Sequence, residues 1–229
     1  MYKFEIHLHT TACSDCAVSS AFEMLDAAKQ NGYSGIVITN HFYNGNTCVD
    51  RSLPWKDFVN EYKKDYENAK SYGEKLGLKV FFGIEEGYEP GKEMLIYGLS
   101  PEILENCPEF KNMSAKEKSE FAHENGGITV CADPFRDRFY IPNPDTPPNP
   151  IFFDGIECFN YFNKDEENDK AFAFAEQCGL IKTSGCDIHN AKDFGKAGIA
   201  FEKPINAYSD LLKYLKSGEY KLIIDGKIK

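Results

Sequence analysis

The sequence predicts a single α/β domain, residues 1–229, in which a parallel sheet closes into a TIM-like barrel. Strand-like and helix-like segments alternate along the chain, a pattern typical of parallel sheets covered by helices. Polar residues able to bind a metal end at least five of the strand-like segments. The carboxyl ends of barrel strands meet at one mouth, whereas those of an open sheet spread along an edge. The expected convergence of these residues therefore favours a barrel.

The first expected strand carries two histidines at alternate positions. In a strand, Phe4, Ile6 and Leu8 share one face and His7 and His9 the other. Neutral imidazole is a frequent metal ligand, so this pair predicts a corner of a metal site. The alternative is the exposed polar face of an ordinary edge strand.

The other elements follow from caps, apolar runs and turn residues. Ser20 and Glu23 form a capping box, and glycines end several helices. Helices are expected over 20–31, about 55–75, between 101 and 125, over 164–179 and about 206–217. Strands are expected over 35–41, 78–89, 93–99, 127–133, 153–160, 180–189, 197–204 and 221–225. The proline-rich segment 141–150 is expected to be an exposed loop or lid.

Composition restricts the possible partners and the compartment. The chain has 36 acidic and 26 basic residues, a net charge of −10, which opposes stable binding to nucleic acid over the whole surface. There is no apolar run of membrane-spanning length, and the first residues lack the features of a signal peptide. We therefore expect a cytoplasmic protein that does not enter the membrane.

Eight cysteines are scattered along the chain, several of them in apolar strand-like runs. These are expected to be reduced core residues. Cys13 and Cys16 form a C-x-x-C, but no second C-x-x-C is present and the surroundings are not those of a redox motif. A zinc or redox role for this pair is therefore not favoured.

The strand-end motifs together resemble those of the PHP (polymerase and histidinol phosphatase) superfamily. HLHTTACSD at residues 7–15 is similar to the family's H-x-H-T followed by S-D, and Thr39-Asn40-His41 is similar to T-D-H. Gly83-Ile84-Glu85 matches G-x-E, and Gly185-Cys186-Asp187-Ile188-His189 is similar to G-S-D-x-H. The motifs occur in the family's order over nearly the whole chain.

The resemblance implies a distorted (β/α)7 barrel that holds two or three divalent metal ions at its mouth, with Zn, Mn or Fe as the candidates. It implies that one ion is bound by His7, His9, Glu85 and Asp187, and that Glu85 bridges to a second. It implies that a third ion is bound by Asp15, His41 and His189. Mixed imidazole and carboxylate ligands suit the same metals.

Two departures from the family pattern affect the second ion. Asp133 stands where the family usually has a histidine, in Ala132-Asp133-Pro134-Phe135-Arg136. Segment 93–99 lacks the histidine that the family often has in the strand after G-x-E. Asp133 is expected to ligate instead, which favours Mn or Fe, or leaves the second position partly filled. Glu93 is a possible substitute, although a surface glutamate is the favoured interpretation.

Several candidates have ordinary structural alternatives. Asp15 is also a common turn-capping residue, and His41 at the end of an apolar strand is also compatible with a core histidine. Glu157 is expected to orient a metal ligand or to pack below the mouth. His123 is expected to be solvated. Arg136 is expected to bind a substrate phosphate through its planar fork, and Lys192 is either a second phosphate contact or surface charge.

The function predicted from these features is a metal-dependent phosphoesterase acting on a small phosphorylated substrate, a phosphomonoester or a nucleotide. Metal-activated water is the expected nucleophile, Arg136 holds the phosphate, and His189 or Asp15 moves the leaving-group proton. A histidinol-phosphate phosphatase, a C–N hydrolase of the amidohydrolase type and a degenerate metal-binding domain without turnover are the alternatives. The sequence does not predict the oligomeric state.

Overall fold

The computed structural model describes residues 1–229 and has the expected mixed α/β character. The strands are β1 Tyr2–Glu5, β2 Gly35–Ile38, β3 Lys79–Glu89, β4 Lys92–Tyr97, β5 Ile128–Ala132, β6 Gly155–Asn160, β7 Ile181–Gly185, β8 Gly198–Phe201, β9 Lys221–Ile224 and β10 Lys227–Ile228. The α-helices are α1 Ala21–Gln30, α2 Trp55–Leu76, α3 Pro101–Glu105, α4 Ala115–Glu124, α5 Asp165–Cys178 and α6 Tyr208–Ser217. Every predicted strand and helix is present, and residues 141–149 contain neither, as predicted.

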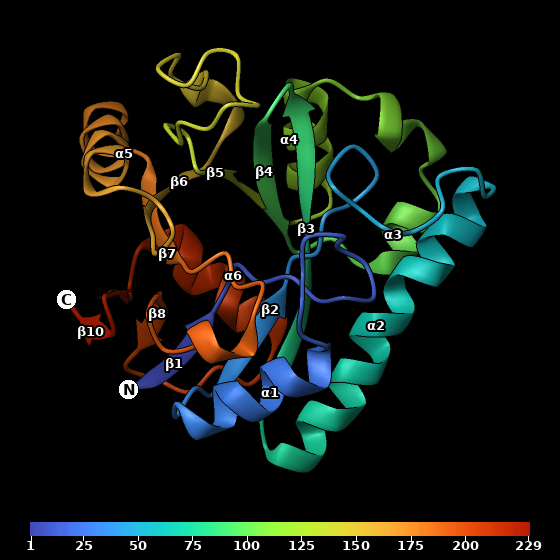
Figure 1. Ribbon diagram of the computed structural model, residues 1–229, viewed down its shortest axis with the longest axis horizontal. Helices are drawn as coiled ribbons and strands as arrows, with labels where there is room; N and C mark the ends of the chain where they lie inside the picture. The colour runs from blue at the N-terminus through green and yellow to red at the C-terminus, as the bar shows by residue number, and fades with distance from the viewer.

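All ten strands belong to one curled sheet in the order β10-β9-β8-β1-β2-β3-β4-β5-β6-β7. Strands β1 to β3 are parallel to one another, as are β5 to β7, while β4 is antiparallel to both of its neighbours. Figure 1 shows helices α1 and α2 on one side of the β1–β3 region and α5 beside β6 and β7. Beyond β7, Ile188 forms a parallel bridge with Leu8. The curl therefore brings the chain after β7 beside the chain after β1.

The hairpin between β3 and β4 departs from a regular repeat of strand and helix. A parallel connection needs a long crossover, but only Pro90 and Gly91 separate these two strands. Gly91 has φ 72°, a conformation that favours glycine, and a Cβ there would lie 2.8 Å from the Ile141 side chain. This tight turn forces β4 to run antiparallel and places its residues at the cavity rim.

The first strand is shorter than the alternating pattern predicts. Strand β1 ends at Glu5, because the Glu5 carboxylate accepts the backbone N–H groups of Ile6 and His7, each at 3.0 Å. The same oxygen accepts the N–H of Cys186 at 3.1 Å and so links the ends of β1 and β7. His7 and His9 therefore follow the strand instead of lying within it.

The expected apolar face of this first segment is buried. Phe4, Ile6 and Leu8 are fully buried, as are His7 and His9 on the opposite side. Both sides of the segment are covered, which excludes the exposed edge strand. None of the helices combines the length and the apolar character needed to cross a bilayer.

Candidate metal centre

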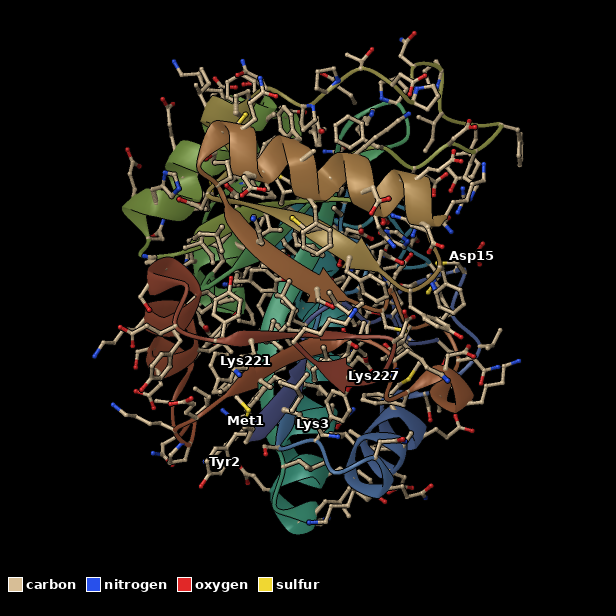
Figure 2. The ribbon with its side chains drawn as sticks, turned by 90° about the vertical axis from the view of Figure 1, so that its left-hand side faces the viewer. Met1, Tyr2, Lys3, Asp15, Lys221 and Lys227 are labelled. Carbon is tan, nitrogen blue, oxygen red and sulfur yellow. The ribbon has the colours of Figure 1, made fainter.

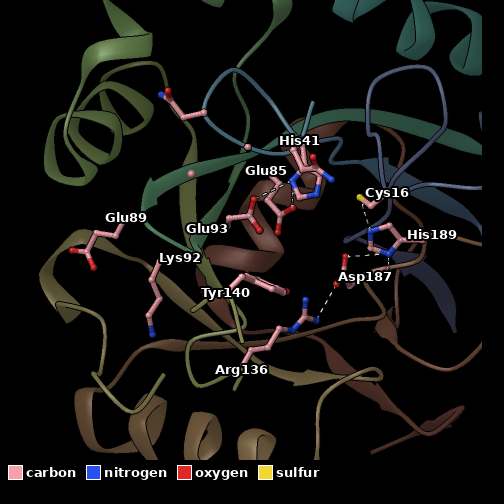
Figure 3. Close-up of a pocket in the computed structure, with 15 residues that line it drawn as sticks. Cys16, His41, Glu85, Glu89, Lys92, Glu93, Arg136, Tyr140, Asp187 and His189 are labelled. Carbon is pink, nitrogen blue, oxygen red and sulfur yellow. Dashed lines mark hydrogen bonds and ion pairs between the residues drawn. The ribbon is translucent and has the colours of Figure 1, made fainter. Parts of the chain in front are cut away.

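A cavity of about 650 Å³ opens where the ends of the central strands meet (Figure 3). Residues from β3, β4 and the segments after β1, β2, β5 and β7 line it. Its chemically reactive lining comprises Cys16, His41, Glu85, Glu93, Arg136, Asp187 and His189. His7 and His9 lie fully buried beside these residues. The predicted convergence of polar strand ends is therefore present for most of the predicted residues.

His7 is held between carboxylates on both of its ring nitrogens. Nδ1 lies 2.8 Å from Glu157 Oε1, and Nε2 lies 3.0 Å from Glu85 Oε1 and 3.5 Å from Asp187 Oδ1. Burial disfavours the charged ring, but the carboxylates outweigh burial and raise the pKa of His7 well above its usual value. Because Nδ1–H donates to Glu157, Nε2 is the nitrogen that a metal would bind after displacing its proton, in keeping with the orienting role predicted for Glu157.

Gly185 in β7 is required for this arrangement. A Cβ at this position would contact Glu157 Oε1 and would lie 2.6 Å from the Cβ of His7. Any larger residue would therefore displace the pair. The glycine of the sequence motif has a packing reason that the motif alone does not reveal.

His9 is oriented by a hydrogen-bonded group behind it. Ser14 Oγ donates to Asn40 Oδ1 at 2.9 Å and accepts the backbone N–H of His41, so the 3.1 Å contact with His9 Nδ1 uses a proton from the imidazole. Asn40 is fixed by Thr10 and Asp65. Burial, followed by the charge of His41, lowers the pKa of His9 to about 3. His9 is thus a neutral ring whose Nε2 points into the centre.

Four buried atoms in this centre that could bind a metal have no hydrogen-bond partner. They are His7 Nε2, His9 Nε2, His41 Nδ1 and Glu85 Oε2. They lie 2.8–3.5 Å from carboxylate oxygens or imidazole nitrogens, but without the alignment of a hydrogen bond. An unpaired buried polar group costs about 1–3 kcal/mol, so such a cluster calls for a shared partner. Divalent cations would accept the lone pairs of these atoms, and the residues therefore fit a metal centre.

The potential ligand atoms form three overlapping triads, each with its atoms within 4.8 Å of one another. The triads are His7, His9 and Glu85; His41, Glu85 and Glu93; and His9, His41 and His189. Burial opposes ionisation of Glu85, but His7 and His41 outweigh it and hold its pKa well below the usual range. Glu85 is thus an anionic residue shared by two triads, in keeping with its expected bridging position.

Glu93 lies in the cavity, so the interpretation of this residue as a surface glutamate is wrong. Its Oε1 is 3.0 Å from His41 Nδ1, and Figure 3 shows it beside Glu85 with its carboxyl group toward His41. Burial, together with the charge of Glu85, raises its pKa. Antiparallel pairing places Glu93 near the end of β3. In the sequence, only the tight hairpin turn at Pro90 and Gly91 indicated this placement.

Asp133 and Arg136 form an ion pair at the other side of the cavity. Arg136 Nη2 lies 2.8 Å from Asp133 Oδ2 and 2.9 Å from Asp187 Oδ2, and its Nε donates to Asn163 Oδ1. Asp133 also accepts from Asn163 Nδ2 at 2.7 Å. Neither Asp133 nor Asp187 is among the triads, and both oxygens of Asp133 are engaged by these partners.

Two aspartates of the centre have strained backbones. Asp133 has φ 43° and Asp187 has φ 55°, values that residues with a side chain seldom adopt. Such conformations cost about 1–3 kcal/mol and cluster at functional sites. These backbone conformations, found directly after β5 and β7, turn the carboxylates of Asp133 and Asp187 toward Arg136.

The structure does not bring Asp15 into the cavity. Its side chain is exposed and makes no hydrogen bond or ion pair, and Figure 2 shows it at the outer edge of the molecule. The next residue, Cys16, lines the cavity instead, with Sγ 3.0 Å from His189 Nε2. Burial disfavours its thiolate, but His189 and His41 outweigh burial and lower the pKa of Cys16 to about 7. Sequence reasoning missed Cys16 because it treated the C-x-x-C as incidental.

Two further candidates lie elsewhere. Lys192 is exposed and does not line the cavity. His123 is 47% exposed in its side chain and lies 2.8 Å from Asp154, away from the centre. His189 does belong to the centre: its Nδ1 donates to the backbone oxygen of Asp187 at 2.7 Å, which leaves Nε2 facing Cys16.

The PHP domain family model matches residues 5–218 of the chain. The protein belongs to the PHP family. The resemblance read from the strand-end motifs is therefore confirmed. No curated protein matches the sequence.

Solved structures with the same fold share little sequence with this PHP protein. A two-domain protein from Bacteroides vulgatus, containing a predicted PHP-like metal-dependent phosphoesterase, is 15% identical with a TM-score of 0.70, over 99% of this chain and 66% of that one. A lesion-specific endonuclease from Pyrococcus furiosus is 13% identical with a TM-score of 0.64, over 96% and 57%. An amidohydrolase from Chromobacterium violaceum, with bound sulfate and no metal, is 13% identical with a TM-score of 0.55, over 82% and 87%.

Proposed function

We propose that this PHP protein is a metal-dependent phosphoesterase that hydrolyses a small phosphorylated substrate, a phosphomonoester or a nucleotide. One observation carries the proposal: four buried nitrogen and oxygen atoms that could bind a metal, and that have no hydrogen-bond partner, converge beside an arginine that borders an open cavity. Convergent lone pairs suit cations, and a guanidinium suits phosphate oxygens. Together they match a substrate whose phosphoryl group lies between metal ions and a fixed positive charge.

The metal ligands follow from the same atoms. His7, His9, Glu85 and Asp187 hold one ion, Glu85 with Glu93 holds another, and His41 with His189 belongs to a third. The overlap of the triads supports two or three ions, with Zn, Mn or Fe as candidates. When bound, divalent ions lower the pKa of water and neutralise charge on phosphate. Asp133 is a weaker candidate than Glu93, because Arg136 and Asn163 engage its oxygens.

Arg136 is the proposed phosphate-binding residue. Two carboxylates and Asn163 fix its Nη2 and Nε, while Nη1 makes no hydrogen bond within the protein. A guanidinium held in this way loses little entropy when it binds an anion. Of the two residues expected to move the leaving-group proton, Asp15 and His189, only His189 borders the cavity.

The closed, distorted (β/α)7 barrel is part of the same proposal. The bridge between Leu8 and Ile188 supports closure of the curled sheet between β1 and β7. Closure would give the metal ligands a single mouth, as in TIM-like barrels.

Metal analysis combined with assays on phosphomonoesters, phosphodiesters and nucleotides, with Mn²⁺, Zn²⁺ or Fe²⁺ added, tests the function. We expect turnover of at least one phosphoester class that a chelator abolishes and metal restores. Tight metal binding without turnover of any phosphoester would instead favour a degenerate domain. Hydrolysis of amides alone would favour the C–N hydrolase.

A further inference from the structure

The loop between His9 and α1 holds Cys16 against the cluster of imidazoles. Ser14 is bound to Asn40 and to the His41 backbone, Asp15 N–H donates to Asn46 O at 3.0 Å, and Val18 N–H donates to His189 O at 2.9 Å. These bonds fix the backbone on both sides of Cys16. Its thiol is therefore directed into the cavity, while the Asp15 side chain points to solvent.

Three imidazoles surround the position that Cys16 faces. The rings of His9 and His189 are stacked with centroids 4.7 Å apart, and those of His9 and His41 are 4.4 Å apart. Potential ligand atoms of all three lie within 4.8 Å of one another. His9 and His41 are both buried, and His9 Nε2 and His41 Nδ1 have no hydrogen-bond partner, which independently indicates a missing ligand within this cluster.

We propose that Cys16 is a thiolate ligand of a metal ion held with His41 and His189, at the position for which the family resemblance implies Asp15. The proposal rests on the metal centre of the proposed function, but not on phosphoester hydrolysis. Binding converts the thiol to a thiolate and releases its proton to solvent. In this arrangement His189 is a ligand through Nε2, and it does not move the leaving-group proton.

A soft thiolate in place of a carboxylate changes which ion this position prefers. Thiolate with imidazoles selects Zn²⁺ or another soft ion, whereas an aspartate would admit Mn²⁺ or Mg²⁺. The carboxylate-rich position of Glu85 and Glu93 does not share this preference. The protein would therefore hold two chemically different ions side by side.

Cys13 of the same loop and Cys48, which is bonded to that loop from the segment after β2, differ from Cys16 in their surroundings. The Sγ of buried Cys13 contacts Tyr62 O at 3.4 Å, and that of exposed Cys48 contacts Thr11 O at 3.7 Å. Neither thiol faces an imidazole nitrogen. Cys48 is therefore a matched control, because it is an exposed thiol of the same region that lies outside the cluster.

The first test loads metal-free protein with Co²⁺ and records thiolate-to-cobalt charge-transfer absorption in the near ultraviolet. We expect the band in the wild-type protein and in Cys48→Ser. We expect Cys16→Ser to lose both the band and roughly one equivalent of bound metal. Cys16→Asp should lose the band but retain the metal, and Asp15→Asn should change neither. A band that persists in Cys16→Ser, or loss of metal in Asp15→Asn, would overturn the proposal.

A second test needs no variant and so does not depend on how a variant folds. Alkylation followed by mass spectrometry should modify Cys16 in the metal-free protein and not in protein saturated with Zn²⁺, while Cys48 is modified in both states. Equal modification of Cys16 in both states contradicts the proposal. A cobalt–thiolate band in a protein that hydrolyses no phosphoester would leave this ligand assignment standing and refute the proposed function alone.

Discussion

Imidazoles and a thiol line the cavity where the chain leaves β1, β2 and β7, whereas a carboxylate and a guanidinium line it at β4 and after β5 (Figure 3). On the imidazole side, Glu157, Ser14 and the Asp187 carbonyl each engage the Nδ1 of a histidine. The opposite nitrogens are thereby left to converge. On the guanidinium side, Asp133 is neutralised by Arg136 and bonded to Asn163.

The difference shows that the partners of a polar residue decide which ligand it can bind. His7 and Asp133 are both polar and both follow a strand. Glu157 binds the Nδ1 of His7, so that its Nε2 faces the position of a cation. Asp133 instead pairs with Arg136 and fixes its guanidinium, and a fixed guanidinium suits an anion. We therefore expect substitutions on the two sides to affect different quantities: metal content on one, and substrate affinity on the other.

The largest expected effect is that of His9→Ala on the imidazole side. It removes a buried nitrogen that two of the triads share. We expect loss of bound metal and a fall in kcat/KM of about 10³-fold, equivalent to ~4 kcal/mol. Metal analysis and steady-state assays measure both. His123→Ala, an exposed histidine outside the cavity, serves as the control and should retain both metal and activity.

If His9→Ala retains its metal and activity, the imidazole side is not the metal centre. A melting curve of the variant separates loss of a ligand from loss of the fold.

The next effect in size is that of Glu157→Gln, which keeps the shape of the side chain but removes the charge behind His7. Loss of such an orienting partner weakens metal affinity by about 10–100-fold. Competition with a chelator measures the affinity. Glu167→Gln is the matched control, because Glu167 is also buried but pairs with Arg138, which does not line the cavity. Equal affinity in both variants would mean that Glu157 only packs beneath the mouth.

The sequence predicts the elements and the imidazoles because both follow from local patterns. Capping residues, glycine stops and apolar runs identify the strands and helices, and the strand-end motifs identify His7, His9, His41, Glu85, Asp187 and His189. Glu5 was missed, because a charged residue in an alternating strand gives no sign that it will accept backbone N–H groups from the residues that follow β1 and β7.

The assignments that depend on loops were harder to predict. Whether Asp15 or Cys16 faces the cavity is decided by contacts with Asn46 and His189, which are distant in sequence. Likewise, Glu93 reaches Glu85 only because β4 runs antiparallel, and a two-residue turn indicates a hairpin without showing which face borders a cavity.

Arg136→Lys sharpens the comparison from the guanidinium side. A lysine keeps the charge but cannot contact Asp133, Asp187 and a phosphate with a planar fork. We expect KM to rise about 10-fold with metal content unchanged, since the contact of the fixed guanidinium with phosphate is lost. Arg138→Lys, which alters an arginine outside the cavity, should leave KM unchanged. A loss of metal in Arg136→Lys would show that the two sides are not separable.

The last prediction concerns stability instead of activity, and it involves Glu5, the carboxyl group that joins the ends of β1 and β7 beside the imidazole side. Burial raises the pKa of Glu5 to about 8 from its ordinary value of 4.5, although the N–H groups of His7 and Cys186 favour the charged form. The folded protein then binds a proton that the unfolded chain has released. Its free energy of unfolding should therefore fall as pH rises from about 4.5 to about 8.

Glu5→Gln removes this dependence, because glutamine keeps an oxygen for the backbone N–H groups but does not ionise. We expect the stability of the wild-type protein relative to Glu5→Gln to decrease by about 1 kcal/mol per pH unit across this range, within the limit for one proton. Urea unfolding of both proteins at several pH values, with a chelator present so that metal binding does not contribute, measures the difference. A difference independent of pH would mean that Glu5 stays ionised, and that the imidazole side holds one more negative charge than we infer.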